Sequence, residues 1–488
     1  MIHQMIHQLK RSFLFLLPLF FPLLAFSQSG DHPQSGAVPQ TAIGNPAIKR
    51  ERPGMEEIYS DFVLYPKRAL LEKDLRERII ARTFSLPLDS NTEYKYASAC
   101  DAISQFLFQS PETERGFRQL FAGYDPLPRD TKKAFLEAVY AVGSGNFATP
   151  VRAILEREKD PKLFAMCAVY LHRCDPGMDN DNSLKIRMAE KFPGYDTVAI
   201  LNELQDYLSY HEGWVKGKTP AIGEFFSYQA SIGQKVIWSF QRWDRDYPGL
   251  AIVQNADGSF ARDQQGKLRV FRQLARSGSD LPYFITDGST PQGIYSIQGT
   301  AVSRTNFIGP TPTLQLIMPN EDCWRRYFLQ RDTSGKPGAS VSPATREGAP
   351  MAPASAPLDS LQLYQGLLPP GWRGYRPMME AWNAGRIGRT EIIAHGTTID
   401  PEYFRRKPFY PLTPTMGCLC AEEVWNPANG RLVISEQFGL VNAFLSTPGS
   451  KGYLYVVNVD DQRMPVSRQE AEEWVKSYEN QKPAGAGF

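Results

Sequence analysis

Histidine and cysteine are scarce in this chain, which contains six of each among 488 residues. So few cysteines in a chain of this length do not make a disulfide-stabilised scaffold. Cys167 and Cys174 would lie roughly 10 Å apart on a shared helix, which is too far for a disulfide bond. Cys418 and Cys420 lack the nearby partner ligands that a zinc site requires, so we expect no metal site.

A strong net charge and long apolar runs are also missing from most of the chain. The net charge is +2, which argues against a nucleic-acid partner and against a polybasic membrane-binding patch. The N-terminus differs, because Lys10 and Arg11 precede an apolar run over 13–26 that ends in Ala25-Phe26-Ser27. This pattern predicts a signal peptide over residues 1–27 and export across the inner membrane to the periplasm. We expect no stable membrane span after signal cleavage, since no later apolar run is long enough.

The chain after the signal peptide begins with a linker and a helical domain. Residues 28–57 are rich in Gln, Ser, Gly and Pro, as in flexible linkers. Residues 58–212 show helical periodicity. Within them, Thr149-Pro150 and Asp160-Pro161 each pair a capping residue with a proline, as at the start of a helix. A protein partner of this helical domain is not identified by the sequence.

Residues 213–465 are predicted to form a β-rich domain. Their short β-branched and aromatic runs predict strands at 235–242, 249–254, 268–274, 283–286, 293–298 and 452–459. An insertion at 333–357 is almost all Ser, Gly, Ala, Pro and Thr, which predicts a surface segment, either a lid or a tolerated loop. In residues 466–488, Ser467 and Glu470 form a capping-box pattern that predicts a C-terminal helix before a tail. The predicted fold class is therefore α+β.

Cys418 and His395 are the candidates for chemistry. His395 is the only histidine after residue 211. A thiol becomes a nucleophile near neutral pH when an imidazole lowers its pKa or takes its proton. We therefore expect a pKa of Cys418 below the ordinary value of about 8.5. The alternative is a buried structural cysteine and an unrelated loop histidine.

Two stretches together resemble the L,D-transpeptidase (YkuD-like) catalytic domain. The segment 287–297, Asp-Gly-Ser-Thr-Pro-Gln-Gly-Ile-Tyr-Ser-Ile, is similar to the family's Thr-Pro-x-Gly-x-(aromatic)-x-Ile pattern. The segments His395-Gly396-Thr397 and Thr415-x-Gly417-Cys418 resemble its His-Gly…(Ser/Thr)-His-Gly-Cys signature. Met416 stands where the family usually has histidine, and Cys420 where it has arginine or asparagine.

The resemblance implies an enzyme without a cofactor that acts on peptidoglycan stem peptides through a thioester. Cys418 would be the nucleophile and His395 the base, oriented by the backbone carbonyl of Gly396. The backbone N–H groups of Gly417 and Cys418 would bind the oxyanion. The motif is completed by Thr415, Met416 and Cys420, and the substrate-binding candidates are Thr397, Tyr295, Arg405 and Arg406.

Three functions remain open from the sequence. The first is a transpeptidase, in which an amine of a second stem accepts the acyl group. The second is an L,D-carboxypeptidase or endopeptidase, in which water is the acceptor. The third is an inactive wall-binding scaffold protein. Arg405 and Arg406 have an equally simple interpretation as a solvated charge cluster.

Overall fold

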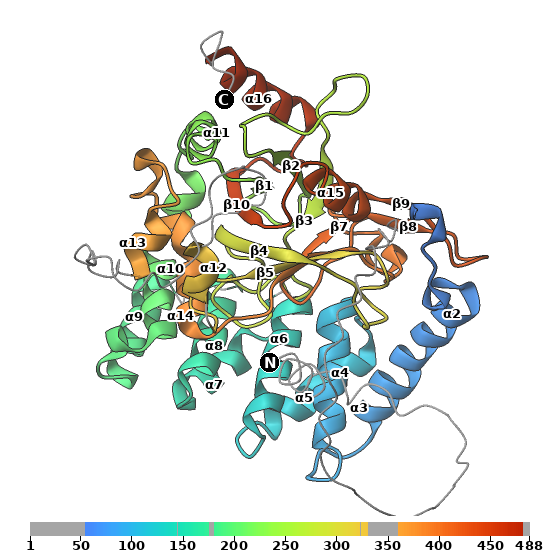
Figure 1. Ribbon diagram of the computed structural model, residues 1–488. Coiled ribbons are helices and arrows are strands. Elements are labelled where there is room, and N and C mark those ends of the chain that lie inside the picture. Colours follow the sequence, from blue (N-terminus) through green and yellow to red (C-terminus); the bar gives the residue numbers. More distant parts are fainter. Residues whose placement is uncertain (1–53, 144, 175–179, 323, 330–359, 482–488) are drawn as a thin grey trace, which may run out of the picture. The chain divides into compact units, whose positions relative to one another are not determined.

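The computed structural model describes residues 54–143, 145–174, 180–322, 324–329 and 360–481. The expected signal peptide, nearly all of the linker, the 333–357 insertion and the C-terminal tail lie outside these residues. The chain from Met55 onward forms one compact unit, with helices first and a β-barrel after them (Figure 1). The predicted α+β class is confirmed.

The helical part begins with two 3₁₀ turns and continues to residue 231. Its elements are Met55–Glu57, Asp61–Val63, α2 (Tyr65–Lys73), the π-helical η3 (Asp74–Arg82), α3 (Thr83–Ser85), α4 (Glu93–Phe106), α5 (Pro111–Ala122), α6 (Arg129–Val142), α7 (Ala148–Arg157), α8 (Pro161–Cys174), α9 (Asp181–Lys191), η4 (Tyr195–Thr197), α10 (Ala199–Lys216) and α11 (Ile222–Ser231). Helix α8 starts as predicted, because Asp160 Oδ1 accepts the backbone N–H of Lys162 at 2.8 Å. The strand expected at 235–242 is present as β1, which begins at Val236, whereas the boundary expected at 212/213 lies inside α10 and helix α11 still follows it.

Eight strands close a barrel in the order β1-β10-β4-β5-β6-β7-β3-β2. They are β1 (Val236–Arg242), β2 (Gly249–Gln254), β3 (Phe271–Leu274), β4 (Gly293–Ala301), β5 (Thr313–Ile317), β6 (Ile393–His395), β7 (Leu419–Ala421) and β10 (Gly452–Asp460). The pairs β1–β10 and β6–β7 are parallel, and the other neighbours are antiparallel. A separate hairpin is formed by β8 (Glu423–Trp425) and β9 (Leu432–Ser435). The strand expected at 283–286 is a turn instead.

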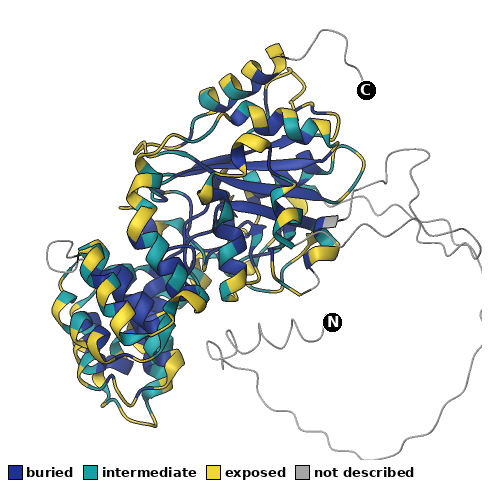
Figure 2. Ribbon diagram, turned by 90° about the vertical axis from the view of Figure 1, so that its left-hand side faces the viewer, coloured by how far each residue is buried: buried dark blue, intermediate teal, exposed yellow. Residues whose placement is uncertain are grey.

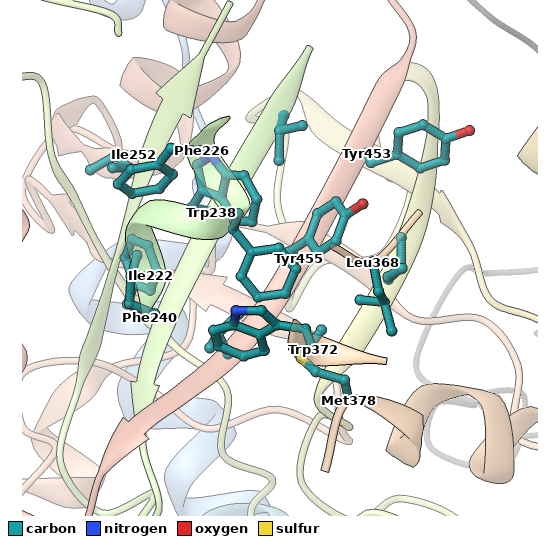
Figure 3. Packing of buried hydrophobic residues seen from close by; sticks show 14 of the residues in the cluster. Ile222, Phe226, Trp238, Phe240, Ile252, Leu368, Trp372, Met378, Tyr453 and Tyr455 are labelled. Atoms are coloured by element: carbon teal, nitrogen blue, oxygen red, sulfur yellow. The ribbon is translucent and has the colours of Figure 1, made fainter. Parts of the chain in front are cut away.

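The barrel wall separates two apolar clusters. One cluster takes alternate residues from all eight strands and therefore fills the barrel interior; Tyr295, Leu314, Ala394 and Leu419 belong to it. The other lies on the outer face of β1, β2, β4 and β10, where Trp238 and Tyr455 pack under Phe226 and Trp372 (Figure 3). Figure 2 shows the strands as the buried layer of this part of the molecule.

Shorter helices complete the β-rich part. They are α12 (Trp324–Leu329), α13 (Ser360–Gln365), η5 (Pro370–Trp372), η6 (Arg376–Met379), α14 (Glu380–Ile387), η7 (Pro401–Phe404), α15 (Glu436–Phe444) and α16 (Arg468–Gln481). The capping box before α16 is confirmed, because Ser467 N donates to Glu470 Oε2 at 2.8 Å and Glu470 N donates to Ser467 Oγ at 3.2 Å. None of the helices in the described ranges is long and apolar enough to cross a bilayer.

The helical part contacts the loop that precedes β4. Lys162 Nζ donates to Thr286 Oγ1 at 2.5 Å, and Lys133 forms an ion pair with Asp287. Tyr283 donates its hydroxyl hydrogen to the buried Glu203 on α10. The loop that carries the first transpeptidase-like motif is thus held from the helical side by polar bonds.

Candidate active site

Strands β6 and β7 bring the two halves of the cysteine–histidine motif together. They run parallel, with Ala394 opposite Leu419 and His395 opposite Cys420. Ala394 and Leu419 point into the barrel interior, so the alternate side chains of His395 and Cys420 point outward. Cys418 lies two residues before Cys420, in the bend immediately ahead of β7, and its Sγ lies 3.7 Å from the backbone oxygen of Glu391, just before β6. The parallel pairing of β6 with β7 therefore brings the two halves of the motif, which are far apart in sequence, next to each other.

The imidazole of His395 is fixed in one orientation. Its Nδ1 lies 2.5 Å from the backbone oxygen of Gly396, so Nδ1 carries the hydrogen and Nε2 carries the lone pair. Burial lowers the pKa of His395 to about 4. The ring is therefore neutral at pH 7 and can accept a proton at Nε2. The Gly396 oxygen thus fixes the ring, while the catalytic role that the resemblance implies for Gly396 stays a prediction.

The turn before Cys418 is built around the Thr415 hydroxyl. This hydroxyl accepts the N–H of Gly417 at 3.1 Å and donates to the backbone oxygen of Cys418 at 2.8 Å. Gly417 has a φ of +107°, which a residue with a Cβ adopts at a cost. The Thr290 hydroxyl, from the first motif, donates to the Gly417 oxygen at 2.9 Å. Both motifs thus meet at this turn, and the expected oxyanion role of the Gly417 N–H is wrong because Thr415 already occupies that N–H.

The Cys418 thiol is half-buried and protonated at rest. Burial raises the pKa of Cys418 to about 11, although the nearby Arg389 guanidinium and the Ile393 backbone N–H act in the opposite direction. The expectation of a lowered pKa is therefore wrong, because desolvation outweighs the stabilising groups and His395 is not an imidazolium. The Sγ lies 3.7 Å from the Glu391 backbone oxygen. Within the described residues, Sγ and the His395 ring form no direct hydrogen bond.

Cys420 is the direct neighbour of His395 across the two strands, and Cys418 is its diagonal neighbour. Cys420 is only 1% exposed, its Sγ lies 3.7 Å from Thr413 Oγ1, and burial raises its pKa to about 12. Cys418 is the more accessible of the two thiols. A substrate can therefore reach the Cys418 thiol. It could reach the Cys420 thiol only after a rearrangement of the strand.

Two of the four substrate-binding candidates are structural. Tyr295 lies in the barrel interior and donates its hydroxyl hydrogen to the Pro291 oxygen at 2.7 Å, so it cannot contact a substrate. Thr397 is buried, and its hydroxyl donates to the Phe307 oxygen at 3.1 Å. The assignment of both residues to substrate binding is therefore corrected.

The other surface candidates remain open to solvent. Arg405 and Arg406 are exposed on the turn after η7, where Glu402 holds the Arg405 guanidinium. Met416 is 42% exposed in the turn that precedes Cys418. The structure does not bring the two arginines into contact with Cys418 or His395, so their substrate role stays a prediction.

Two charged residues near the site were not predicted from the sequence. Arg389 is buried against the turn of residues 415–418 and donates to the backbone oxygens of Ser289 and Gly288, each at 3.0 Å. A Cβ at Gly417 would lie 2.5 Å from Arg389 Nη2, which shows how closely the guanidinium approaches this turn. Glu423 is buried under the His395-Gly396-Thr397 segment. Charged residues are usually exposed to solvent, so the sequence gives no sign that Arg389 and Glu423 are buried at this site.

Neither a metal nor a disulfide accounts for these groups. Within the described ranges, no cluster of three or more His, Cys, Asp or Glu side chains is placed to hold a metal ion. Cys418 and Cys420 are free, as are Cys100, Cys167 and Cys174.

The chain matches no family model, no curated protein and no solved structure. The candidate site therefore rests on the motifs and on the geometry just described.

Proposed function

We propose that this protein is an exported, cysteine-dependent L,D-transpeptidase that acts on peptidoglycan stem peptides. The observation that carries the proposal is the parallel pairing of β6 with β7, which brings His395 beside the turn that holds Cys418, with His395 Nδ1 fixed by the Gly396 carbonyl. The choice of substrate rests on the two motifs, and the export rests on the signal-peptide pattern at residues 1–27.

The spacing allows proton transfer between the two groups. Strand separation of about 4.8 Å and a rise of about 3.3 Å per residue place the Cα atoms of diagonal neighbours about 8 Å apart. The Cys418 thiol lies 3.7 Å from the Glu391 oxygen, so proton transfer to the ring requires the thiol to turn toward His395. A neutral thiol and a neutral imidazole favour general-base catalysis over a preformed thiolate–imidazolium pair.

In the first half-reaction, Sγ of Cys418 attacks the carbonyl carbon of the third stem residue while its proton passes to His395 Nε2. We assign the backbone N–H of Cys418 to the resulting oxyanion, since the Gly417 N–H is engaged by Thr415. The C–N bond to the terminal D-amino acid then breaks, and the departing amine takes the proton from Nε2. The product is a thioester on Cys418.

In the second half-reaction, an amine of a second stem attacks the thioester carbonyl. The new C–N bond forms and the C–S bond breaks, while His395 Nε2 takes the proton released by the attacking amine and passes it to Sγ. Arg389 supports both steps, because a buried cation beside the turn stabilises negative charge on sulfur and oxygen. The family's usual donor two residues after the nucleophile is replaced here by Cys420, and Arg389 supplies a cation from a different element.

A hydrolase is the second candidate, and one observation favours it. Cys418 is only half-buried and its neighbour Met416 is 42% exposed, so water can approach a thioester at this position. With water as the acceptor, the same intermediate yields a tripeptide, as an L,D-carboxypeptidase would.

The experiment incubates the protein, after removal of residues 1–27, with disaccharide-tetrapeptide at increasing concentrations of acceptor stem. Mass spectrometry then follows the products. The proposal expects a cross-linked dimer that increases with acceptor and is absent in Cys418→Ala. If tripeptide is the sole product at every acceptor concentration, the hydrolase is the correct function and the transpeptidase is not. If neither product forms, the remaining candidate is the inactive wall-binding scaffold protein.

A further inference from the structure

A buried carboxyl group lies on the far side of the peptide bond that orients His395. The Gly396–Thr397 peptide has its oxygen 2.5 Å from His395 Nδ1, and its N–H donates to Glu423 Oε2 at 2.9 Å. Both bonds use the same planar amide group. Imidazole, peptide and carboxyl thus form one continuous hydrogen-bonded chain.

The other bonds of Glu423 hold it in this place. Its Oε1 accepts the hydroxyl of Ser435 at 2.7 Å from the paired strand β9. The carboxyl group occupies the position that a Cβ on residue 396 would need, which explains a glycine there. Trp425 Nε1 donates to the Thr397 oxygen at 2.8 Å and fixes the same segment from the side. The arrangement is therefore preorganised by both strands of the β8–β9 hairpin.

A buried carboxyl group without a cation is costly, which makes its presence informative. Glu423 is 6% exposed, and within the described part of the chain it forms no ion pair. Burial raises the pKa of Glu423 to about 7, while its hydrogen bonds from Ser435 and Thr397 oppose this shift. Perturbed carboxyl groups of this kind are concentrated at functional sites. A purely structural role would be served as well by an uncharged side chain of similar shape.

We propose that Glu423 is a positioning residue that completes a peptide-bridged triad with His395 and Cys418. When His395 takes the Cys418 proton, positive charge develops on the ring and the Nδ1–H···O bond to Gly396 strengthens. A carboxylate that accepts a hydrogen bond from the N–H of the same amide increases the electron density on the Gly396 oxygen. That oxygen then becomes a better hydrogen-bond acceptor for Nδ1–H. Glu423 thus stabilises the imidazolium from one peptide away, as the aspartate does by direct contact in a Ser-His-Asp triad.

The titratable groups that face Glu423 are few and stay neutral near pH 7. Cys420 on β7 interacts with the carboxyl, and burial raises the pKa of that thiol to about 12. His395 lies across the shared peptide, and burial lowers its pKa to about 4. The ionisation of Glu423 is therefore the event near neutral pH that changes the charge around this peptide.

The inference rests on the proposed chemistry of His395, but its first test needs no turnover. The Nδ1–H proton resonance of His395 is followed by NMR in the wild-type protein between pH 5 and pH 9. We expect an inflection near pH 7 that is absent in Glu423→Gln and retained in Glu422→Gln. Glu422 is the matched control because it is the next residue and pairs with Arg272 instead. A resonance without an inflection in the wild type would overturn the proposal, whatever the stem-peptide assay shows.

The second test measures alkylation of Cys418 and kcat across the same pH range. The amide of Glu423→Gln still accepts the Thr397 N–H, so the fold is retained and only the charge is lost. We expect kcat to fall roughly tenfold with little change in KM, less than the 10²–10⁴-fold effect of losing a general base, and the rate increase near pH 7 to disappear. Equal pH profiles for Glu423→Gln and Glu422→Gln would show that Glu423 is only structural. A normal NMR inflection in a protein without turnover would instead disprove the proposed function and leave the triad intact.

Discussion

The two faces of β6 and β7 have opposite characters although they are made by alternate residues of the same short strands. The inner face carries Ala394 and Leu419, which pack among apolar side chains from every strand of the barrel. The outer face carries His395 and Cys420, with Cys418 just before them. The inner residues fix the register, and that register decides which thiol lies beside the imidazole and which lies diagonal to it. Residues that pack the barrel interior therefore alternate along these strands with residues of the candidate site.

The largest effect is expected on the outer face, from Cys418→Ala. This change should remove all detectable turnover, because no other accessible thiol among the described residues faces the site, while the melting temperature shifts little. The matched control is Cys420→Ala, which removes a thiol two residues away. Turnover is measured with disaccharide-tetrapeptide. Loss of activity in Cys420→Ala with activity retained in Cys418→Ala would assign the reaction to the other cysteine.

The corresponding change on the inner face is Leu419→Ala. Leu419 is fully buried, and truncating a buried leucine costs about 2–5 kcal/mol of unfolding free energy through lost contacts and the cavity left behind. Chemical denaturation measures this loss. A cost below about 1 kcal/mol would mean that the barrel interior is not closely packed at β7, and the contrast between the two faces would fail.

A smaller effect is expected from Arg389→Gln. The change removes the buried cation near Cys418, so the pKa for alkylation of Cys418 should rise. It also leaves the Gly288 and Ser289 oxygens without their donors, at roughly 1–3 kcal/mol for each buried group. Arg386→Gln is the control, because Arg386 is exposed on α14. Identical alkylation profiles for the two variants would show that the guanidinium does not act on the thiol.

The last effect concerns the pH dependence of stability. His395 has a folded pKa of about 4, below its ordinary value of about 6.5. Between these values the unfolded chain binds more protons, so stability present above pH 6.5 is lost as the pH falls toward 4, by at most about 3 kcal/mol. His395→Gln should flatten the stability curve in this window. An unchanged slope would mean that the ring is solvated rather than buried.

The local signals in the sequence predicted much of the scaffold. Three predicted features depend only on neighbouring residues, and the structure has all of them. They are the helix start at Pro161, the strand at 249–254 and the capping box at Ser467. The segment 283–286 was predicted as a strand from its aromatic and β-branched residues, but it forms a turn. Contacts with Lys162 and Arg389, which are distant in sequence, hold this turn and override the local preference.

The candidate site was only partly predictable for the same reason. Cys418, His395 and Gly396 could be found because the motif keeps them close in sequence. Tyr295 could have been excluded, since the alternation with Ile297 along β4 places both in the barrel interior. Glu423 gave no local signal, because its role depends on the register of β6 with β7 and on the β8–β9 hairpin.

The most direct test of the central claim is the intact mass of the protein after treatment with a carbapenem, a reactive acyl donor. The account predicts one covalent adduct, located on Cys418 by peptide mapping, with no adduct in Cys418→Ala and a normal adduct in Cys420→Ala. His395→Ala should form the adduct much more slowly, because the thiol is protonated at rest and needs a base. An adduct on Cys420, or equal rates with and without His395, would contradict the assignment of nucleophile and base made from the two strands.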